Sequence, residues 1–318
     1  MVSTVDGGRP VHRVHPQRKG NPTMTRYEYG IDFDALDAID IHTHVEIDGC
    51  GHRSLDDDLM AASEKYFKSG EERTPTITSI AEHYRQRNMA AVVFTIDARS
   101  ATGHDPNSVE EIAELATENN DVLIPFGSVD PLQGKAAVKR LRRLVDEYGV
   151  KGFKFHPSLQ GFEPNDRRYY PLYEALTEAG VPALFHTGQT GIGAGLPGGH
   201  GIKLRYSDPM LLDDVAADFP DLTIIMAHPA IPWVDAQISI ATHKANVYLD
   251  LSGWSPKYFP SQLVKAANTI LRRKVLFGSD FPVIQVDRWM ADFWKLDIKP
   301  EVEPLIFKQN ALRVLGIG

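Results

Sequence analysis

The feature that most limits how this chain can fold is a regular alternation of short apolar segments with amphipathic ones. Eight segments are apolar, short and bounded by turn residues, as buried β-strands are: 38–41, 90–96, 122–126, 152–156, 183–186, 222–228, 247–251 and 275–278. Segments with apolar residues at helical spacing lie between or after them: 76–88, 108–118, 134–147, 168–179, 208–218, 232–244, 260–273 and 304–315. The pattern is that of repeated β-α units.

The strands of these units are predicted to form a parallel sheet. Segment 222–226 is apolar at all but one position, which indicates burial on both faces. Eight β-α units in one chain favour a (β/α)8 TIM barrel over an open doubly wound sheet. We therefore expect a single α/β barrel domain over residues 27–318. No Gly-x-Gly-x-x-Gly motif opens a helix after the first strand, and the sequence has no Walker loop, so dinucleotide and nucleoside triphosphate binding lose their main support.

Three segments depart from the alternation. Residues 1–26 are rich in Gly, Pro and Arg without a period, and we expect a disordered leader. Residues 46–74 form an insertion after the first strand, with helical character over 55–67, and we expect a lid-like pocket wall. The glycine-rich segment 188–201 is predicted to be a second flexible loop near the same end of the barrel.

Composition excludes several classes of protein. A net charge of −8 argues against a nucleic-acid surface, which needs clustered Lys and Arg. No apolar run approaches the roughly 20 residues that span a bilayer, and the N-terminus lacks the apolar core of a signal peptide. The single cysteine, Cys50, fits a reducing compartment. We expect a cytoplasmic protein.

Polar residues occur where several of the predicted strands end. In a barrel these carboxyl-terminal ends form the active face. His42 and His44 are two residues apart at the end of the first strand, so their side chains point the same way. Three later strands also end in a possible ligand or base: His186, His228 and Asp280. Five such residues on one ring favour a metal site over isolated hydrogen-bonded histidines.

Motifs around these residues carry a family resemblance. In chain order they are Ile39-Asp-Ile-His-Thr-His44, Lys151-Gly-Phe-Lys-Phe-His-Pro157, Phe185-His-Thr-Gly188, Met226-Ala-His-Pro229 and Phe277-Gly-Ser-Asp-Phe-Pro282. From about Ile39 to Leu315 the sequence resembles the amidohydrolase superfamily, and within it the amidohydrolase-2 branch that includes aminocarboxymuconate-semialdehyde decarboxylase.

The resemblance implies a distorted barrel that holds a divalent metal, and a homodimer. It implies His42, His44, His186 and Asp280 as metal ligands, with His228 orienting or deprotonating a metal-bound water. We expect one Zn²⁺, with Mn²⁺ as the alternative, because imidazole and carboxylate ligands suit both ions. Bound zinc lowers the pKa of water to about 7, while His228 and Asp280 are suited to move its proton.

Four further residues are candidates for substrate contacts. Lys154 and His156 lie on one face of the fourth strand. A carboxylated Lys154 would bridge two metals in binuclear members of the superfamily; the closer branch is mononuclear, which favours one metal and Lys154 as a pocket cation. Arg205 is a candidate carboxylate anchor and Trp254 a candidate aromatic wall. A solvated surface charge and a packing residue are the alternatives for these two.

Three reactions are compatible with this set of residues. The first hypothesis is a metal-dependent hydrolase that uses a metal-activated water on an ester, lactone or amide of a small, carboxylated substrate. The second is a non-oxidative decarboxylase of an aromatic or unsaturated acid, and the third is a hydratase of an unsaturated dicarboxylate. All three use the same ligands, so the motifs leave the choice open.

Overall fold

The computed structural model describes residues 25–67 and 74–317. The expected leader therefore lies outside the described residues except for its last two, and the end of the expected insertion lies outside them as well. Arg26 donates to the carbonyl oxygen of Val145 at 3.4 Å, which places the start of the described chain against the outer helical layer. No helix in the described residues combines the length and the apolar composition needed to cross a bilayer.

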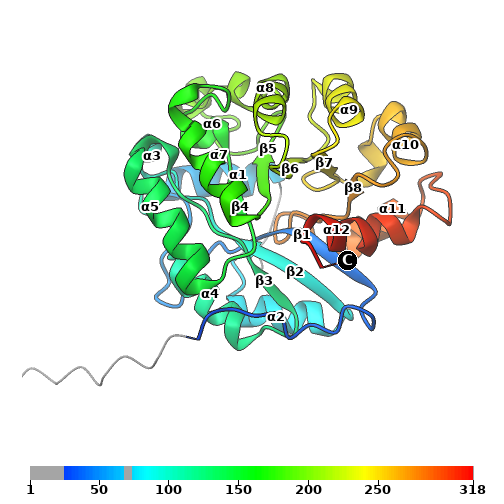
Figure 1. The fold of residues 1–318 in the computed structure, drawn as a ribbon, viewed down its shortest axis with the longest axis horizontal. Helices are drawn as coiled ribbons and strands as arrows, with labels where there is room; N and C mark the ends of the chain where they lie inside the picture. The colour runs from blue at the N-terminus through cyan, green and yellow to red at the C-terminus, as the bar shows by residue number, and fades with distance from the viewer. Residues whose placement is uncertain (1–24, 68–73, 318) are drawn as a thin grey trace, which may run out of the picture.

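All eight predicted strands are present, and every pairing between them is parallel. They are β1 (Ala38–His44), β2 (Met89–Phe94), β3 (Leu123–Pro125), β4 (Phe153–Phe155), β5 (Ala183–His186), β6 (Ile224–Ala227), β7 (Val247–Asp250) and β8 (Val275–Leu276). One sheet has the order β1-β2-β3 and the other β4-β5-β6-β7-β8 (Figure 1). Consecutive strands are neighbours throughout, as repeated right-handed β-α units require.

Backbone hydrogen bonds join the two sheets at both edges. Between β3 and β4, the amide of Gly127 donates to Gly152 O and its carbonyl accepts from Lys154 N, both at 2.8 Å. Between β8 and β1, the amide of Ile41 donates to Phe277 O at 3.1 Å. The short strands at both joints leave few such bonds, so the predicted (β/α)8 TIM barrel is closed but distorted.

Both faces of the strands are buried. In β5, Leu184 belongs to the cluster inside the barrel, whereas Phe185 packs in the outer layer beneath the helices. This double burial explains why the strand sequences are continuously apolar. In β1 the pairing register with β2 shifts between Asp40 and Thr43, as at a β-bulge. A bulge redirects the side chains that follow it. Ile41 and His42 therefore both lie on the inner side of the barrel, although neighbouring residues of a regular strand would face opposite sides.

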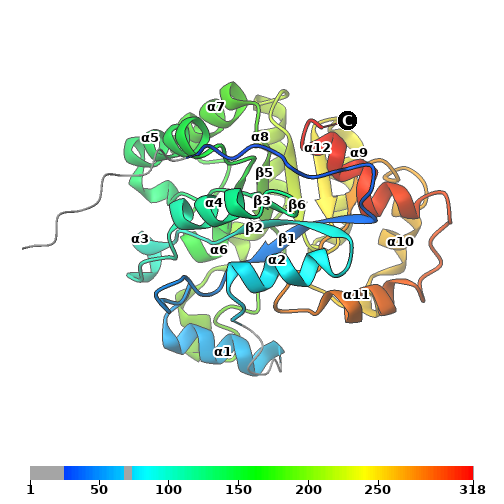
Figure 2. The same ribbon diagram turned by 90° about the horizontal axis from the view of Figure 1, so that it is seen from below.

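Helices surround the barrel (Figures 1 and 2). They are α2 (Ile77–Arg85), α3 (Arg99–Thr102), α4 (Val109–Glu118), α5 (Lys135–Arg143), α6 (Pro157–Gln160), α7 (Tyr170–Ala179), α8 (Met210–Asp218), α9 (Val234–His243), α10 (Ser261–Ala267), α11 (Val286–Phe293) and α12 (Asn310–Val314). The alternation predicted most of them. It missed the short helices α3 and α6 and also α11, which follows β8 and packs its buried Trp289 against the barrel.

The insertion after β1 forms α1 (Asp57–Phe67), which lies apart from the outer helices at one end of the barrel (Figure 2). Its Tyr66 hydroxyl accepts a hydrogen bond from Gln189 Nε2 at 3.3 Å. The glycine-rich segment after β5 therefore contacts α1. Both segments contribute to the wall of one cavity, which is the position we expected for a lid.

The joint between β3 and β4 gives a test of the closed barrel. A Cβ added at Gly152 would lie 2.4 Å from the ring of Phe126, which is buried. We expect Gly152→Ala to lower the free energy of unfolding by about 1–3 kcal/mol, the usual cost of overpacking. Urea unfolding measures this, with the exposed Lys139→Ala on α5 as control. An unchanged midpoint in Gly152→Ala would contradict the tight joint.

Candidate metal centre

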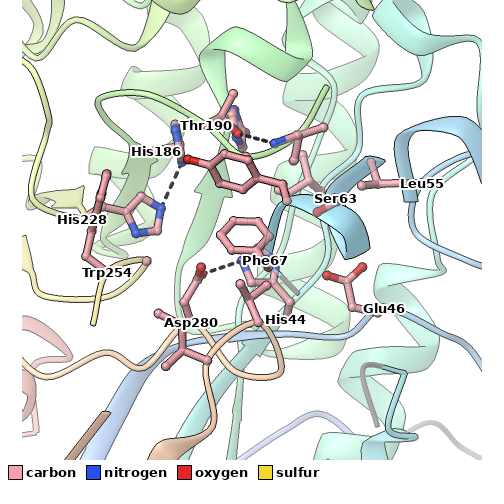
Figure 3. A pocket seen from close by; sticks show the side chains of 18 of the residues that line it. His44, Glu46, Leu55, Ser63, Phe67, His186, Thr190, His228, Trp254 and Asp280 are labelled. Carbon is pink, nitrogen blue, oxygen red and sulfur yellow. Dashed lines mark hydrogen bonds and ion pairs between the residues drawn. The ribbon is translucent and has the colours of Figure 1, made fainter. Parts of the chain in front are cut away.

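Three possible metal ligands meet at the carboxyl-terminal ends of β1 and β8. Asp280 Oδ1 lies 3.2 Å from His42 Nε2 and 3.1 Å from His44 Nε2. The amide of Asp280 donates to His42 O at 3.0 Å, so the two strand ends are held together by the backbone as well. Figure 3 shows His44 and Asp280 facing each other at the bottom of a cavity. The sequence predicted all three residues as ligands.

The backbone is strained at two residues of this site. Asp280 and His228 both have φ of +69°, in the left-handed region that non-glycine residues rarely adopt. Such strain costs on the order of 1–3 kcal/mol and persists only where the surroundings enforce it. At His228 they do, because its amide donates to Asp250 Oδ1 at 3.2 Å and its carbonyl accepts from Gln237 Nε2 at 2.7 Å.

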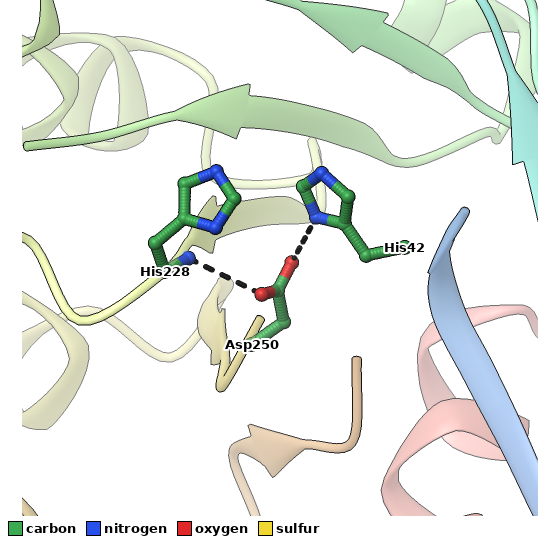
Figure 4. Close-up of side chains that lie close together, drawn as sticks. All are labelled: His42, His228 and Asp250. Carbon is green, nitrogen blue, oxygen red and sulfur yellow. Dashed lines mark hydrogen bonds and ion pairs between the residues drawn. The ribbon is translucent and has the colours of Figure 1, made fainter. Parts of the chain in front are cut away.

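Asp250, at the end of β7, orients His42. Its Oδ2 lies 2.9 Å from His42 Nδ1, and both side chains are fully buried (Figure 4). Burial alone would raise the pKa of Asp250, but the interactions with His42 hold it below its usual value. An ionised carboxylate only accepts hydrogen bonds, so His42 carries its proton on Nδ1. Its Nε2 lone pair therefore faces His44 and Asp280, as a metal ligand requires.

A hydrogen-bonded chain sets the proton positions of two further histidines. Ser252 Oγ donates its only proton to Asp250 Oδ1, so it accepts from His228 Nδ1, 2.8 Å away. The Nε2 of His228 then lacks a proton and accepts from His186 Nδ1 at 3.0 Å. This leaves a lone pair on His186 Nε2, a buried atom with no hydrogen-bond partner among the described residues.

These residues fit a divalent metal. Imidazole nitrogens and a carboxylate are the ligands that Zn²⁺ and Mn²⁺ accept. His42, His44 and Asp280 form one group of closely spaced ligand atoms. His42, His228 and Asp250 form a second, overlapping group, but there Asp250 already accepts from His42 Nδ1. We therefore favour the first group, with the unpartnered His186 Nε2 as the fourth ligand.

His186 is less closely joined to the other ligands than the sequence led us to expect. Its ligand atom is not part of either closely spaced group, and its link to the site is the hydrogen bond to His228. It does lie in the same cavity, where its ring is buried (Figure 3). Burial holds the pKa of His186 well below its usual value, so the imidazole is neutral and able to bind a metal.

Lys154 and His156 also reach this cavity from β4. Lys154 is fully buried, with Nζ 3.1 Å from His42 Nε2, and burial lowers the pKa of its ammonium to about 8. The ring of His156 stacks on His186 with centroids 3.8 Å apart. Its Nδ1 accepts from the amide of Leu159 at 3.2 Å, so its Nε2 proton points to Thr190 Oγ1. Lys154 supplies a cation beside the ligands, and His156 a neutral wall.

The cavity itself has a volume of about 320 Å³ and opens to solvent, a size suited to a small ligand. Its apolar wall combines aliphatic side chains with four aromatic ones, which come from α1 and from the segment after β7: Tyr66, Phe67, Trp254 and Tyr258. Its charged side chains are Glu46, Lys154, Asp280 and Arg288.

The family assignment follows from comparison with known proteins. The family model Amidohydro_2, described as amidohydrolase, matches residues 39–317, nearly the whole described chain. The chain belongs to the amidohydrolase-2 family. This confirms the resemblance that the strand-end motifs carry, and with it an enzyme of that family.

Individual relatives of this amidohydrolase are distant. One curated relative, 2-keto-4-carboxy-3-hexenedioate hydratase of a Sphingobium species, is 27% identical over 214 residues, which are 56% of this chain and 60% of the relative. The match thus spans less than two thirds of that protein. Among solved structures, an uncharacterized TIM-barrel protein from Bordetella bronchiseptica has a TM-score of 0.73 at 24% identity, covering 88% of this chain and 98% of that one.

Two decarboxylases share the fold at lower identity. The 5-carboxyvanillate decarboxylase of Sphingomonas paucimobilis has a TM-score of 0.62 at 14% identity, covering 89% of this chain and 100% of that one. The 2,6-dihydroxybenzoate decarboxylase of Rhizobium has a TM-score of 0.64 at 15% identity, covering 89% of this chain and 99% of that one. At these identities the likeness establishes the barrel fold alone.

Two of the expected substrate contacts in this amidohydrolase have different outcomes. Trp254 lines the cavity, as expected for an aromatic wall. Arg205 does not line it, so the structure favours the alternative of a surface charge over a carboxylate anchor. Its side chain is 61% exposed and its guanidinium lies 3.2 Å from the carboxylate of Glu163. The loop after β5 turns this arginine outward, so it is a surface charge.

Four residues of the site were not anticipated. Asp250 ends a predicted buried strand, the same signal that identified His186, and Ser252 follows it by two residues. Glu46 follows His44 by two residues and is buried in the cavity, where it accepts from Ser54 Oγ (Figure 3). Arg288 lies on the unpredicted helix α11, and no sequence signal marked it.

Proposed function

We propose that this protein is a divalent-metal-dependent lyase, in the first instance a non-oxidative decarboxylase, of a small aromatic or unsaturated carboxylic acid. The observation that carries this proposal is the composition of the cavity. A buried cation, Lys154, and a neutral imidazole, His228, lie beside the metal ligands beneath an aromatic wall. That arrangement suits a planar acid whose carboxylate lies next to the ligands and whose carbon exchanges a proton with His228.

The metal would be held by His42, His44 and Asp280, with His186 as the fourth ligand. When bound, a divalent ion supplies Lewis-acid polarisation of substrate oxygens. We propose a single ion, Mn²⁺ or Zn²⁺. Manganese is present in solved structures of decarboxylases of the same fold from Novosphingobium aromaticivorans and a Polaromonas species, which supports Mn²⁺.

The protein's own residues supply binding and proton transfer. Lys154 Nζ is placed to pair with the substrate carboxylate, a contact strengthened by its burial. Burial lowers the pKa of His228, so the imidazole is neutral and its Nε2 can take up a proton. Nε2 of His228 first takes up a proton from water. Cleavage of the bond to the carboxylate then releases carbon dioxide and leaves the electron pair on carbon, and Nε2–H gives that proton to the carbon, which returns the ring to its neutral form. The hydrogen bond from His186 Nδ1 to His228 Nε2 must break before Nε2 can exchange a proton with the substrate carbon.

Ser252 and Asp250 keep His228 in the required state. Because Ser252 accepts from His228 Nδ1, the nitrogen that faces the cavity is the one without a proton. Asp250 is ionised and linked through Ser252, so it also stabilises His228 once that ring becomes protonated. The pair therefore act as positioning residues for proton transfer.

A hydratase is the second candidate. The curated relative at 27% identity is a hydratase of an unsaturated carboxylic acid, and its name supports this reaction. The match covers 60% of that protein's length. Hydration uses the same ligands and the same proton transfer to carbon. The hydrolase that we first expected has less support, since the named relatives are decarboxylases and a hydratase.

One experiment separates the three reactions. The Mn²⁺-loaded protein is incubated in H₂¹⁸O with 2,6-dihydroxybenzoate, 5-carboxyvanillate and 2-keto-4-carboxy-3-hexenedioate, each of which is a relative's substrate or carries its chemistry. We expect release of carbon dioxide, no ¹⁸O in the remaining product, and one deuterium on carbon when D₂O is used. Uptake of ¹⁸O with loss of a double bond and without carbon dioxide identifies a hydratase. An aromatic lactone, dihydrocoumarin, is the fourth probe, and its ring opening with ¹⁸O in the new carboxyl group identifies a hydrolase.

A further inference from the structure

Helix α11 carries three charged side chains, of which two have partners. Asp287 accepts two hydrogen bonds from Arg87, at 2.6 and 2.8 Å. Asp292 pairs with Lys295 at 2.9 Å. Arg288 lies between them, and no hydrogen bond or ion pair of its guanidinium occurs within residues 25–67 and 74–317. An arginine with five donors is thus left for a ligand.

The backbone that carries Arg288 is fixed relative to the metal ligands. The indole of Trp289 is fully buried and donates to Leu251 O, at the end of β7, at 3.2 Å. Ser255 Oγ donates to Asp292 from the segment that follows β7. These contacts hold α11 against the strand ends, so the Arg288 side chain can change rotamer while its Cα stays in place.

Arg288 lines the cavity at its outer side. Its side chain is exposed, whereas Lys154 and Asp280 line the same cavity and are buried. The cavity therefore has one cation at its inner end beside the metal ligands and another at its opening. The same cavity is lined by the aromatic side chains of Tyr258 and Trp254. The planar guanidinium of an arginine matches a carboxylate, which it can bind through two parallel hydrogen bonds.

We infer that Arg288 binds a second carboxylate of the substrate, so that the enzyme acts on a dicarboxylic acid. The first carboxylate lies by Lys154 and the metal ligands, a placement that rests on the proposed function. The second lies at the cavity opening, where the arginine is the specificity-determining residue. This assigns to Arg288 the role that Arg205 lacks, because Arg205 is paired with Glu163 outside the cavity.

Equilibrium binding tests this without turnover. Isothermal titration calorimetry compares benzene-1,3-dicarboxylate with benzoate on the Mn²⁺-loaded protein. We expect the dicarboxylate to bind about 10- to 100-fold more tightly, the range for a charge-assisted pair. Arg288→Met is expected to abolish this ratio and leave benzoate binding unchanged, while Arg288→Lys retains part of it. Arg205→Met, the matched arginine outside the cavity, is expected to leave the ratio intact.

Two results would overturn the inference. One is a wild-type protein that binds the dicarboxylate no more tightly than benzoate, or not at all. The other is an Arg288→Met variant that keeps the full ratio. Failure of the proposed function has a different signature, because an intact ratio together with no reaction on any acid would contradict lyase activity alone.

Discussion

Replacing His228 with Asn is expected to lower kcat by about 10²- to 10⁴-fold, the range for loss of a positioned general acid or base. The introduced carboxamide has no group that takes up a proton near neutral pH. The bound metal should remain, because His228 is not among the three closely spaced ligands that include His44 and Asp280. Steady-state kinetics and metal analysis of the same preparation test both statements.

The matched control is Ser252→Ala, which leaves the imidazole in place but removes its hydrogen-bond acceptor. Loss of such an outer partner costs roughly 10- to 100-fold. We therefore expect an intermediate kcat together with a changed pH dependence, since Nδ1 is no longer held protonated. Activity of the His228→Asn variant within about threefold of wild type, far less than loss of a general acid or base costs, would remove His228 from the mechanism.

Replacing Asp280 with Asn is expected to release the metal and abolish turnover. Asp280 Oδ1 lies between His42 Nε2 and His44 Nε2, so the substitution removes the anion that contacts both imidazoles at that point. Asn also tolerates the left-handed backbone at this position, which Ala does not, so the fold should be preserved. We expect metal affinity to fall by more than about 100-fold, beyond the loss typical of an outer-sphere partner.

Two measurements on the Asp280→Asn variant separate loss of the metal from loss of the fold. Competition with a chelating dye gives the metal affinity, and far-ultraviolet circular dichroism with a thermal melt reports the barrel. A variant that binds the metal as wild type does, or that is active, would exclude Asp280 as a ligand. A variant that does not fold calls for the conservative Asp280→Glu, for which we expect a weak but measurable affinity.

The fold was predictable because burial on both faces of each strand requires continuous apolar runs in the sequence. Leu184 and Phe185 are neighbours that face opposite layers, and both must be apolar. The alternation missed α11 because it expects one helix after each strand, and it assigns segment 304–315 as the helix that follows β8. The two-residue period of a strand could not by itself predict that the His42 side chain points inward, because this direction depends on the bulge after Asp40.

The site was predictable to the extent that it is set by strand ends. His44, His186 and Asp280 end or follow their strands, and the barrel brings those ends to one face. Asp250 obeys the same rule and was overlooked, although a buried carboxylate at a strand end is the same signal. Arg205 was misplaced because the direction of a loop residue depends on turns that a single sequence does not specify. Arg288 instead reaches the cavity from helix α11, which the alternation did not predict.

The position of the metal is the central claim, and anomalous diffraction tests it most directly. A crystal of the Mn²⁺-loaded protein, measured at a wavelength where manganese scatters anomalously, should show one peak per chain. We predict that this peak lies between His42 Nε2, His44 Nε2 and Asp280, with His186 Nε2 as the next nearest nitrogen. A peak beside His42 Nδ1 and Asp250, or no peak in protein shown to be saturated with manganese, would contradict the account.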